Sequence, residues 1–555
     1  MTTEFRLHQN NKLQTKKMFM KSLSLIIFVI LSDLYLCYGT LTVKLNQGDV
    51  QGYHKKSYYG RTYSAFEGIP YAVPPVGELR FKEPIPAPRW EDTLIANKSY
   101  MCSQLDGTLS VVGTEDCLYM YVYVPKKSIN KADNFDVVVH IHGGYLNIGS
   151  PYNMVLPDYI MDKNVILVAL NYRLGAAGFL STGDCEVYGN NGFKDQVLAL
   201  KWIQKNIRQF GGNPNSVTIT GFSSGASSVE FHYISPLSKG LFHKGWSLSY
   251  TVLGSGSLTL IPEEKSKLLA QKVQCPTDTT RKMIQCLRRQ PIEKLVDQMV
   301  TWFKPVVEKG NPKAFIPENP YKLLKDKKVY DLPWVVSNVI NESLFSLESV
   351  YKNRSEIFSI YNNFTEWGRS LLDLVEYVDA DKLDYVINEL KKFYLEDGEL
   401  TAENGLEKLN RLLTDRHFLV ASDLAVRTQA LATKSPVYFY LSEYVPEDRL
   451  EFFGAPGASH GVDSKLLFKF RTNPDRLKPK DEKMMRLFTE FIEEYARTGI
   501  PKIGNVTWIP ITPNQQKLNV LSIKSPDNIK MIKLEELAPR RIWDRLPIKE
   551  NNHLF

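Results

Sequence analysis

The sequence predicts an α/β protein in which helices cover both faces of a large, mostly parallel, twisted sheet. Three apolar or β-branched runs have the length of buried strands, at residues 136–142, 165–171 and 216–220. Between the second and third runs, apolar residues recur at helical spacing over residues 195–203. Strands that alternate with helices in this way form parallel sheets that are buried on both faces.

The segments on either side of this core have patterns of their own. Residues 40–130 alternate short apolar runs with Gly and Pro, as β-hairpins do. Residues 260–430 are largely helical in pattern, a late strand follows at 437–441, and helices resume around 481–497. No internal repeat or low-complexity linker divides the chain, although length alone, at about 150 residues per domain, suggests three or four domains.

Composition excludes several classes of protein. Of the 555 residues, 43% are hydrophobic and 23% are charged, which excludes a disordered, collagen-like or polytopic membrane protein. The 69 Lys and Arg residues against 61 Asp and Glu residues give a net charge of +8, and no dense basic block occurs. We therefore expect no nucleic-acid partner.

The first 39 residues have the pattern of a secretory signal peptide. Lys16, Lys17 and Lys21 precede an apolar run at residues 23–31, which is shorter than the roughly 20 residues that span a bilayer. Small residues at 37–39 suit a cleavage site, so the mature chain would begin near Thr40. The alternative is a buried core helix. No later segment is long and apolar enough to cross a membrane, and we expect a secreted, extracellular protein without a membrane anchor.

Cysteines and sequons agree with an oxidising, extracellular compartment. Of the six cysteines, Cys37 would leave with the signal peptide, and two local pairs remain that could close short loops: Cys102 with Cys117, and Cys275 with Cys286. Spacing alone does not determine which cysteines pair. The remaining Cys185 would then be free, and we expect it to be buried. Four glycosylation sequons begin at Asn97, Asn353, Asn363 and Asn505, and a fifth begins at Asn341.

The motif Gly-Phe-Ser-Ser-Gly at residues 221–225 is the sharpest chemical feature. A β-branched strand precedes it and small residues follow it, where a helix would begin. The two glycines suit a strand-to-helix elbow, because such a turn leaves no room for side chains around the central serine. Ser223 Oγ would then be exposed beside the positive end of the new helix. The alternative is a glycine-rich turn without chemistry.

A serine nucleophile needs amide donors for the oxyanion that it creates. His142-Gly143-Gly144 directly follows a predicted buried strand, upstream of the serine, where a hydrolase oxyanion loop occurs. The backbone amide of Ser224 would complete the oxyanion hole. An ordinary turn at the end of a strand is the alternative interpretation.

A general base and an acid should follow in the order serine, acid, histidine. His460, one of only nine histidines, lies in a loop of small residues after the late strand. Glu342 follows a buried run at 332–336, near the carboxyl end of a strand, where α/β active sites form. Each residue alone is weak evidence, since a loop histidine is commonly a surface residue and a lone glutamate is commonly a solvated carboxylate.

Several further motifs resemble the type-B carboxylesterase/cholinesterase family of α/β-hydrolases, and the likeness is greatest to insect carboxylesterases. They are Phe-Glu-Gly-Ile-Pro-Tyr-Ala at the start of 66–81, Glu-Asp-Cys-Leu-Tyr at 115–119, Asn-Tyr-Arg-Leu-Gly at 171–175, Gly-Phe-Leu at 178–180, Gly-Phe-Lys-Asp-Gln at 192–196 and Phe-Gly-Gly-Asn-Pro at 210–214. The resemblance covers nearly the whole mature chain. It implies one α/β-hydrolase domain over residues 40–555, with the helical stretch forming insertions around a gorge rather than a separate domain.

The resemblance also implies roles for individual residues. Ser223 would be the nucleophile, Glu342 the acid and His460 the base, with the oxyanion held by the amides of Gly144, Tyr145 and Ser224. Glu342 would be buried against the histidine, so the sequon at Asn341 would be unused. The family pattern further implies disulfides Cys102–Cys117 and Cys275–Cys286 and ion pairs Arg80–Glu115 and Arg173–Asp195. It implies no cofactor and no metal.

The chain departs from the family pattern at four positions near these residues. Tyr145 stands where a third glycine usually follows Gly143-Gly144, and this should reduce turnover or narrow the acyl pocket. Phe222 replaces a common glutamate, Ser224 replaces alanine, and Ser343 replaces the glycine after the acid.

Two functions follow from this pattern. The first is a secreted serine carboxylesterase that hydrolyses uncharged, apolar, small-molecule esters through an acyl-enzyme. The second is a catalytically weakened or inactive esterase-fold protein that binds or sequesters esters, or acts in adhesion. The retained Ser223, Glu342 and His460 favour the first function, and Tyr145 is the main argument for the second.

Overall fold

The computed structural model describes residues 41–296, 302–396, 398–448, 450 and 457–553. The predicted signal peptide, residues 1–39, and the expected mature start near Thr40 therefore lie outside the described residues. Contacts divide the chain into two units, Met1–Thr42 and Val43–Phe555, and the fold described below is that of the second unit.

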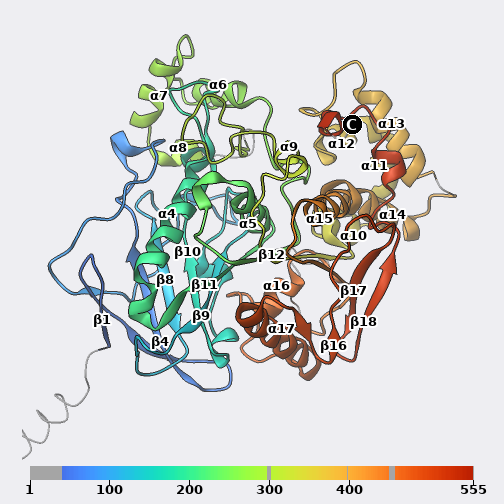
Figure 1. The fold of residues 1–555 in the computed structure, drawn as a ribbon. Coiled ribbons are helices and arrows are strands. Elements are labelled where there is room, and N and C mark those ends of the chain that lie inside the picture. The colour runs from blue at the N-terminus through green and yellow to red at the C-terminus, as the bar shows by residue number, and fades with distance from the viewer. Residues whose placement is uncertain (1–40, 297–301, 397, 449, 451–456, 554–555) are drawn as a thin grey trace, which may run out of the picture. The chain divides into compact units, whose positions relative to one another are not determined.

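An 11-stranded sheet forms the centre of this unit (Figure 1). Its strands, in spatial order, are β18 (Asn528–Leu534), β17 (Leu518–Ser525), β14 (Val437–Ser442), β13 (Trp334–Val339), β12 (Lys244–Leu248), β11 (Gly212–Phe222), β9 (Phe135–Ile141), β10 (Val165–Leu170), β8 (Tyr119–Val124), β4 (Thr62–Pro70) and β3 (Tyr53–Lys56). Pairing is parallel from β17 through β10 and antiparallel at both ends. The predicted fold class is confirmed, and the predicted strands correspond to β9, β10, β11 and β14.

The remaining strands form small separate sheets. These are β1 (Thr42–Lys44), β2 (Asp49–Gln51) and β5 (Leu94–Ile95) in one sheet, β6 (Gln104–Leu105) with β7 (Val111–Val112) in a second, and β15 (Lys502–Ile503) with β16 (Val506–Thr507) in a third. The pair β6 and β7 lies within the loop that the first disulfide closes.

Helices pack on the sheet and also form a separate layer of insertions. In chain order they are α2 (Pro151–Met154), α3 (Gly175–Phe179), α4 (Asn191–Asn206), α5 (Ser224–Ile234), α6 (Pro262–Lys272), α7 (Thr280–Arg289), α8 (Ile292–Val296), α9 (Pro320–Lys325), α10 (Glu348–Lys352), α11 (Glu356–Asn362), α12 (Phe364–Leu371), α13 (Leu383–Tyr394), α14 (Ala402–Thr414), α15 (Val420–Ala432), α16 (Val462–Leu467), α17 (Pro479–Thr498) and α18 (Arg540–Trp543). The predicted helices at 195–203 and 481–497 correspond to α4 and α17.

Two hydrophobic clusters hold these layers together. Because side chains alternate across a strand, one face of the sheet contributes Val138, Leu167 and Trp246 to a cluster that also contains Phe488 and Phe491 of α17. The insertions α10–α14 bury a second cluster of their own, which the C-terminal Trp543, Leu546 and Ile548 join. This second cluster explains the helical pattern of residues 348–414, which pack on one another and not on the central sheet.

Both expected disulfides, Cys102–Cys117 and Cys275–Cys286, are formed. The expected ion pairs are also present, with Arg80 Nε 2.6 Å from Glu115 Oε1 and Arg173 Nη2 2.6 Å from Asp195 Oδ1.

The prediction that Cys185 is buried was wrong, because its side chain is exposed. It lies in the irregular loop between α3 and α4, where Asp184 accepts hydrogen bonds from Thr182 Oγ1 and from the amide of Glu186. Such a turn satisfies its polar groups locally at the surface and buries no side chain at its tip.

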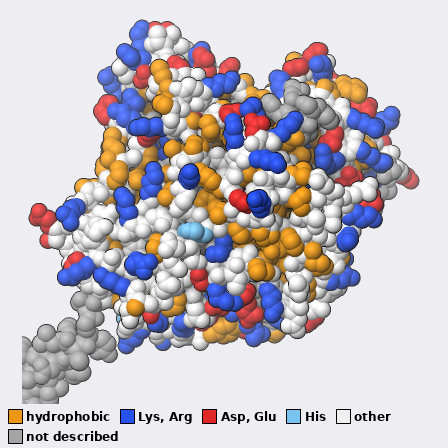
Figure 2. Space-filling view, in the orientation of Figure 1, with side chains coloured by type: hydrophobic (Ala, Val, Ile, Leu, Met, Phe, Trp, Pro, Cys, Tyr) orange, Lys and Arg blue, Asp and Glu red, His pale blue; other side chains and the backbone are white. Residues whose placement is uncertain are grey.

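Acidic and basic side chains are interspersed on the face shown in Figure 2, where hydrophobic side chains also gather between them. This mixture fits the modest net charge of +8. Within the described ranges, no helix is long and apolar enough to cross a membrane.

Candidate active site

The predicted chemical residues meet at the carboxyl edge of the parallel strands. Ser223 follows β11, and Glu342 follows β13 as the first residue of the short helix η5 (Glu342–Leu347). A single β-bridge pairs Asn341 with Ser459, so the next residue of each segment, Glu342 and His460, lies beside the other. This is the edge at which α/β proteins place their ligands.

The backbone at Ser223 forms a sharp elbow. Ser223 has φ 56° and ψ −123°, a conformation that L-residues rarely adopt, and α5 begins at the next residue. A Cβ on Gly221 would lie 2.1 Å from the carbonyl oxygen of Gly225, and a Cβ on Gly225 would lie 2.1 Å from that of Ile141. Both motif glycines are therefore required by close packing of backbone on backbone.

The loop after β9 lies directly against this elbow. A Cβ on Gly143 would approach the carbonyl oxygen of Phe222 to 2.6 Å and the Cβ of Ser223 to 3.0 Å. Gly144, Tyr145 and Leu146 follow with φ values of 109°, 57° and 60°. Residues 144–146 thus form a left-handed turn next to the serine, where their amides can face an oxyanion.

Glu342 and His460 form a direct hydrogen bond, although they are 118 residues apart in the sequence. His460 Nδ1 lies 2.7 Å from Glu342 Oε2. The other carboxylate oxygen, Oε1, accepts from the Asn338 side-chain amide at 2.8 Å and from the Val339 backbone amide at 3.0 Å. Glu342 is fully buried, and these partners hold its carboxylate in one orientation.

His460 lines the same cavity as Ser223 and is surrounded by aromatic rings. Its ring contacts those of Phe222, Phe345 and Phe418, at centroid distances of 4.6, 5.2 and 5.1 Å. His142, beside Gly143, has a structural role instead. Burial lowers its pKa to about 4, so its ring is neutral, and its Nδ1 lies 2.9 Å from the Gly143 carbonyl oxygen.

Asp463 is a buried carboxyl next to this pair that our reading of the sequence missed. Burial raises its pKa to about 6, and the charge of Glu342 adds to the rise. Tyr440 donates a hydrogen bond of 2.6 Å to its Oδ2. The available signal was its place three residues after His460, on the first turn of α16.

Comparison with known proteins identifies the family. A model of the carboxylesterase family matches residues 39–539. The chain belongs to the carboxylesterase family. This carboxylesterase is 36% identical over 526 residues to venom carboxylesterase-6 of Apis mellifera. The match covers 91% of this chain and 94% of that relative. It is 37% identical over 535 residues to a carboxylic ester hydrolase of Bombus ignitus, covering 92% of the chain and 94% of the relative.

A solved structure supports the same assignment. The juvenile hormone esterase of Manduca sexta, determined with OTFP covalently attached, matches with a TM-score of 0.79 at 25% identity. The match covers 93% of this chain and 99% of that one. The fold is therefore that of an α/β-hydrolase, and this carboxylesterase is a carboxylic ester hydrolase that acts on small-molecule esters.

A small cavity in the carboxylesterase holds both Ser223 and His460 on its wall. Its volume is about 70 Å³, and Leu146, Tyr250 and Phe418 contribute to a mainly apolar lining. Tyr145 and Trp302 also line it and meet edge to face, with ring centroids 5.0 Å apart. Their side chains remain 48% and 42% exposed, so two large rings stand over the cavity without being buried in a core.

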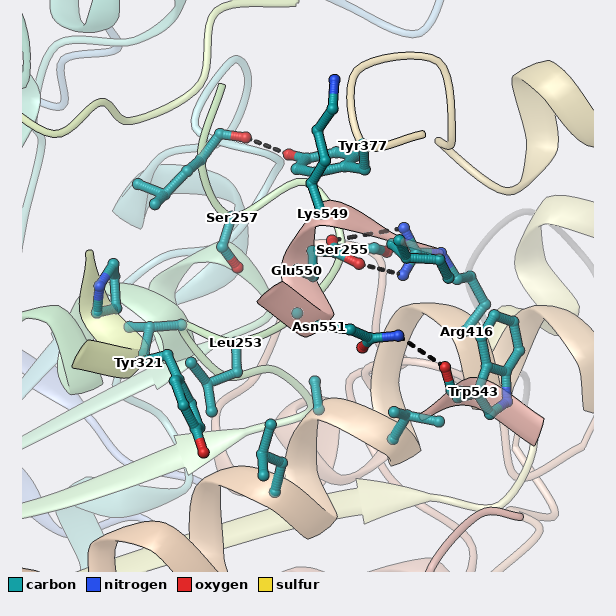
Figure 3. Close-up of a pocket in the computed structure, with 18 of the residues that line it drawn as sticks. Leu253, Ser255, Ser257, Tyr321, Tyr377, Arg416, Trp543, Lys549, Glu550 and Asn551 are labelled. Atoms are coloured by element: carbon teal, nitrogen blue, oxygen red, sulfur yellow. Dashed lines mark hydrogen bonds and ion pairs between the residues drawn. The ribbon is translucent and has the colours of Figure 1, made fainter. Parts of the chain in front are cut away.

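A second cavity of about 150 Å³ adjoins the cavity that Ser223 and His460 line, and Ser257 lines both. Figure 3 shows the C-terminal residues Glu550 and Asn551 on its wall. Arg416 Nη1 lies 2.7 Å from Glu550 Oε2, and Asn551 Nδ2 donates to the Trp543 carbonyl oxygen at 2.8 Å. The first bond fastens the end of the described chain to the helical insertions, and the second lies within the C-terminal segment itself.

Proposed function

We propose that this carboxylesterase is a secreted serine esterase that hydrolyses uncharged, apolar esters through an acyl-enzyme. The observation that carries the proposal is the 2.7 Å hydrogen bond between Glu342 and His460 beside a cavity that Ser223 also lines. A nucleophile, a base and a residue that orients the base are the parts that acyl transfer requires.

Acylation begins when Ser223 Oγ attacks the ester carbonyl carbon and its proton passes to His460 Nε2. Glu342 holds the ring through Nδ1–H and stabilises the imidazolium that forms. The amides of Gly144, Tyr145 and Ser224 stabilise the oxyanion, and removing one such donor costs roughly 3–4 kcal/mol in comparable sites. His460 then returns the proton to the alkoxide, and the alcohol leaves.

Deacylation repeats these steps with water. His460 takes a proton from a water molecule, whose oxygen attacks the acyl carbon of the Ser223 ester. When the second tetrahedral intermediate collapses, the carboxylic acid leaves and Ser223 recovers its proton. No metal or cofactor takes part in either half of this reaction.

The cavity lining supports an uncharged substrate. Apolar and aromatic side chains dominate the wall, and Lys304, its cationic residue, is already paired with Asp373 at 2.7 Å. A charged ester would lose hydration without gaining a partner there. The volume of about 70 Å³ further favours esters with short acyl groups in this conformation.

Secretion rests on the signal-peptide pattern of residues 1–39 and on the chemistry of the mature chain. The two disulfides suit an oxidising compartment. Asn97, Asn353, Asn363 and Asn505 are exposed and could carry glycans. Asn341 is half-buried and accepts a hydrogen bond of 2.9 Å from Asn410, which supports its sequon remaining unused.

A catalytically weakened binder remains the second candidate, because Tyr145 adopts φ 57° where glycine would be relaxed. Purified protein and a Ser223→Ala variant, assayed with a short-chain aryl acetate, decide between the two. We expect the wild type to turn over and the variant to lose at least about 10³-fold in kcat. Equal inertness of both proteins, with a labelled ester still bound, would overturn catalysis and support the binder.

A further inference from the structure

The hydroxyl of Ser224 joins the helix that carries the nucleophile to the turn that faces it. Ser224 is the first residue of α5 and is buried directly after Ser223. The backbone amide of Leu146 donates to Ser224 Oγ at 3.1 Å. Because a buried amide without an acceptor is destabilising, this bond determines where the turn ends.

The same hydroxyl also acts on Tyr172. The Ser224 side chain lies near enough to the Tyr172 hydroxyl to lower the pKa of that phenol, against the larger rise that burial causes. The Tyr172 hydroxyl in turn donates to the His142 carbonyl oxygen at 2.9 Å, and the His142 ring stacks on the Tyr172 ring with centroids 4.5 Å apart. A series of interactions therefore runs from the Leu146 amide through Ser224 and Tyr172 to the His142 carbonyl oxygen, with a hydrogen bond at each end, and we call this series the Ser224 circuit.

This circuit encloses the residues whose amides would hold the oxyanion. Gly144, Tyr145 and Leu146 all have positive φ, and only the first is glycine. An amide in such a turn points at the serine only while the turn keeps its conformation, and a side chain at position 145 favours relaxation into other conformations. The circuit holds the turn at both ends, at residues 142 and 146.

We propose that Ser224 is a positioning residue whose hydroxyl keeps the amides of Gly144 and Tyr145 directed at Ser223. The proposal rests on the proposed function, because it assigns those amides to the oxyanion of an acyl transfer. Alanine at position 224 would leave the Leu146 amide and the Tyr172 hydroxyl without this shared partner, and the turn would lose one of its two restraints.

The kinetic test compares Ser224→Ala and Tyr172→Phe with Ser228→Ala. Ser228 is a matched control, since it is a buried serine of the same helix whose hydroxyl donates to the Ser224 carbonyl oxygen at 2.8 Å. We expect Ser224→Ala to lower kcat about tenfold, less than the 10²–10³-fold caused by removing a donor. The inhibition constant of a trifluoromethyl ketone, which forms an oxyanion, should rise equally.

The KM and the inhibition constant of the matching methyl ketone should stay within about twofold, because neither depends on oxyanion stabilisation. Equal losses in Ser224→Ala and Ser228→Ala, or a change confined to KM, would overturn the proposal and leave Ser224 a structural residue.

Hydrogen exchange separates this inference from the proposed function. In the free protein, amides of residues 142–149 should exchange faster in Ser224→Ala and Tyr172→Phe than in wild type or Ser228→Ala. Unchanged exchange would contradict the circuit even if the enzyme is active. An inert wild type with faster exchange in the two variants would contradict the proposed catalysis but not the restraint.

Discussion

Ser223 lies between two groups of residues that are held in different ways: the Glu342–His460 pair, here called the acid–base side, and the turn at residues 144–146, here called the oxyanion side. On one side, the Glu342–His460 pair sits on helix and strand ends, and Glu342 has partners for both carboxylate oxygens. On the other side, residues 144–146 form a left-handed turn that is held by other segments: Ser224 of α5 accepts from the Leu146 amide, and Gln104 bonds both the amide and the carbonyl of Gly149, three residues further along.

The two sides therefore differ in which contacts keep them rigid. The acid–base side derives its order from its own buried hydrogen bonds, so changes there alter chemistry directly. The oxyanion side is kept in place by contacts with α5, with Tyr172 and with the first disulfide loop. The exposed rings of Tyr145 and Trp302 also lie on this side. Changes there should alter geometry and selectivity first.

The largest effect should come from breaking the acid–base side. We expect Glu342→Gln to lower kcat/KM by about 10³–10⁴-fold, because an amide cannot stabilise the imidazolium and favours the wrong tautomer of His460. Steady-state kinetics on an aryl acetate measure this. Retention of more than a tenth of wild-type kcat/KM would remove Glu342 from the mechanism.

A second buried carboxyl sharpens the contrast with Glu342. Glu230 on α5 is fully buried, its Oε2 accepts one hydrogen bond from the Val252 amide at 2.7 Å, and its Oε1 has no partner among the described residues. Burial raises its pKa to about 8. Between its ordinary pKa of about 4.5 and 8, the unfolded chain binds fewer protons, so stability falls as pH rises.

Glu230→Gln should remove this dependence. Its stability relative to wild type should rise between pH 4.5 and 8, by at most about 1.4 kcal/mol per pH unit, and then level off. Urea unfolding midpoints from pH 5 to 9 measure the difference, while kcat at pH 7 should stay within about twofold. A constant offset across this range would mean that Glu230 is ionised in the folded protein.

The smallest effect should appear on the oxyanion side. Replacing Trp302 by alanine removes one of the two rings over the cavity, and we expect the ratio of kcat/KM for a bulky ester to that for acetate to rise about tenfold. Tyr385→Ala is the matched control, since Tyr385 is an exposed aromatic residue on α13 outside the lining of the cavity. An unchanged ratio would show that the Tyr145–Trp302 pair does not limit acyl size.

Sequence patterns predicted the strands, which have a regular hydrophobic pattern, and the elbow, where close packing requires glycine. Continuous apolar runs identified β9 and β10, and crowding at Gly221 and Gly225 explains why the elbow motif singles out Ser223. The role of Glu342 could be predicted only from the family resemblance, because a single glutamate after a strand has no recognisable pattern of its own. The same limit hid Asp463, and spacing carried no information about the exposure of Cys185.

Contacts between distant segments were beyond sequence reasoning. The Ser224 hydroxyl meets Leu146, 78 residues earlier, and Gln104 meets Gly149 across a disulfide loop. Such pairs depend on how loops return to the sheet edge, which neither periodicity nor local motifs encode.

The assignment of Ser223 as the nucleophile is tested by mapping the covalent adduct of an organophosphate that carries a fluoride or aryloxide leaving group. Attack by Ser223 displaces that group, so mass spectrometry should find one phosphylated residue, Ser223, at a stoichiometry near one per chain. Ser223→Ala should give no adduct, and Glu342→Gln should react far more slowly. An adduct on Ser224 or another residue, or none on wild type, would contradict the assignment of Ser223 as the nucleophile.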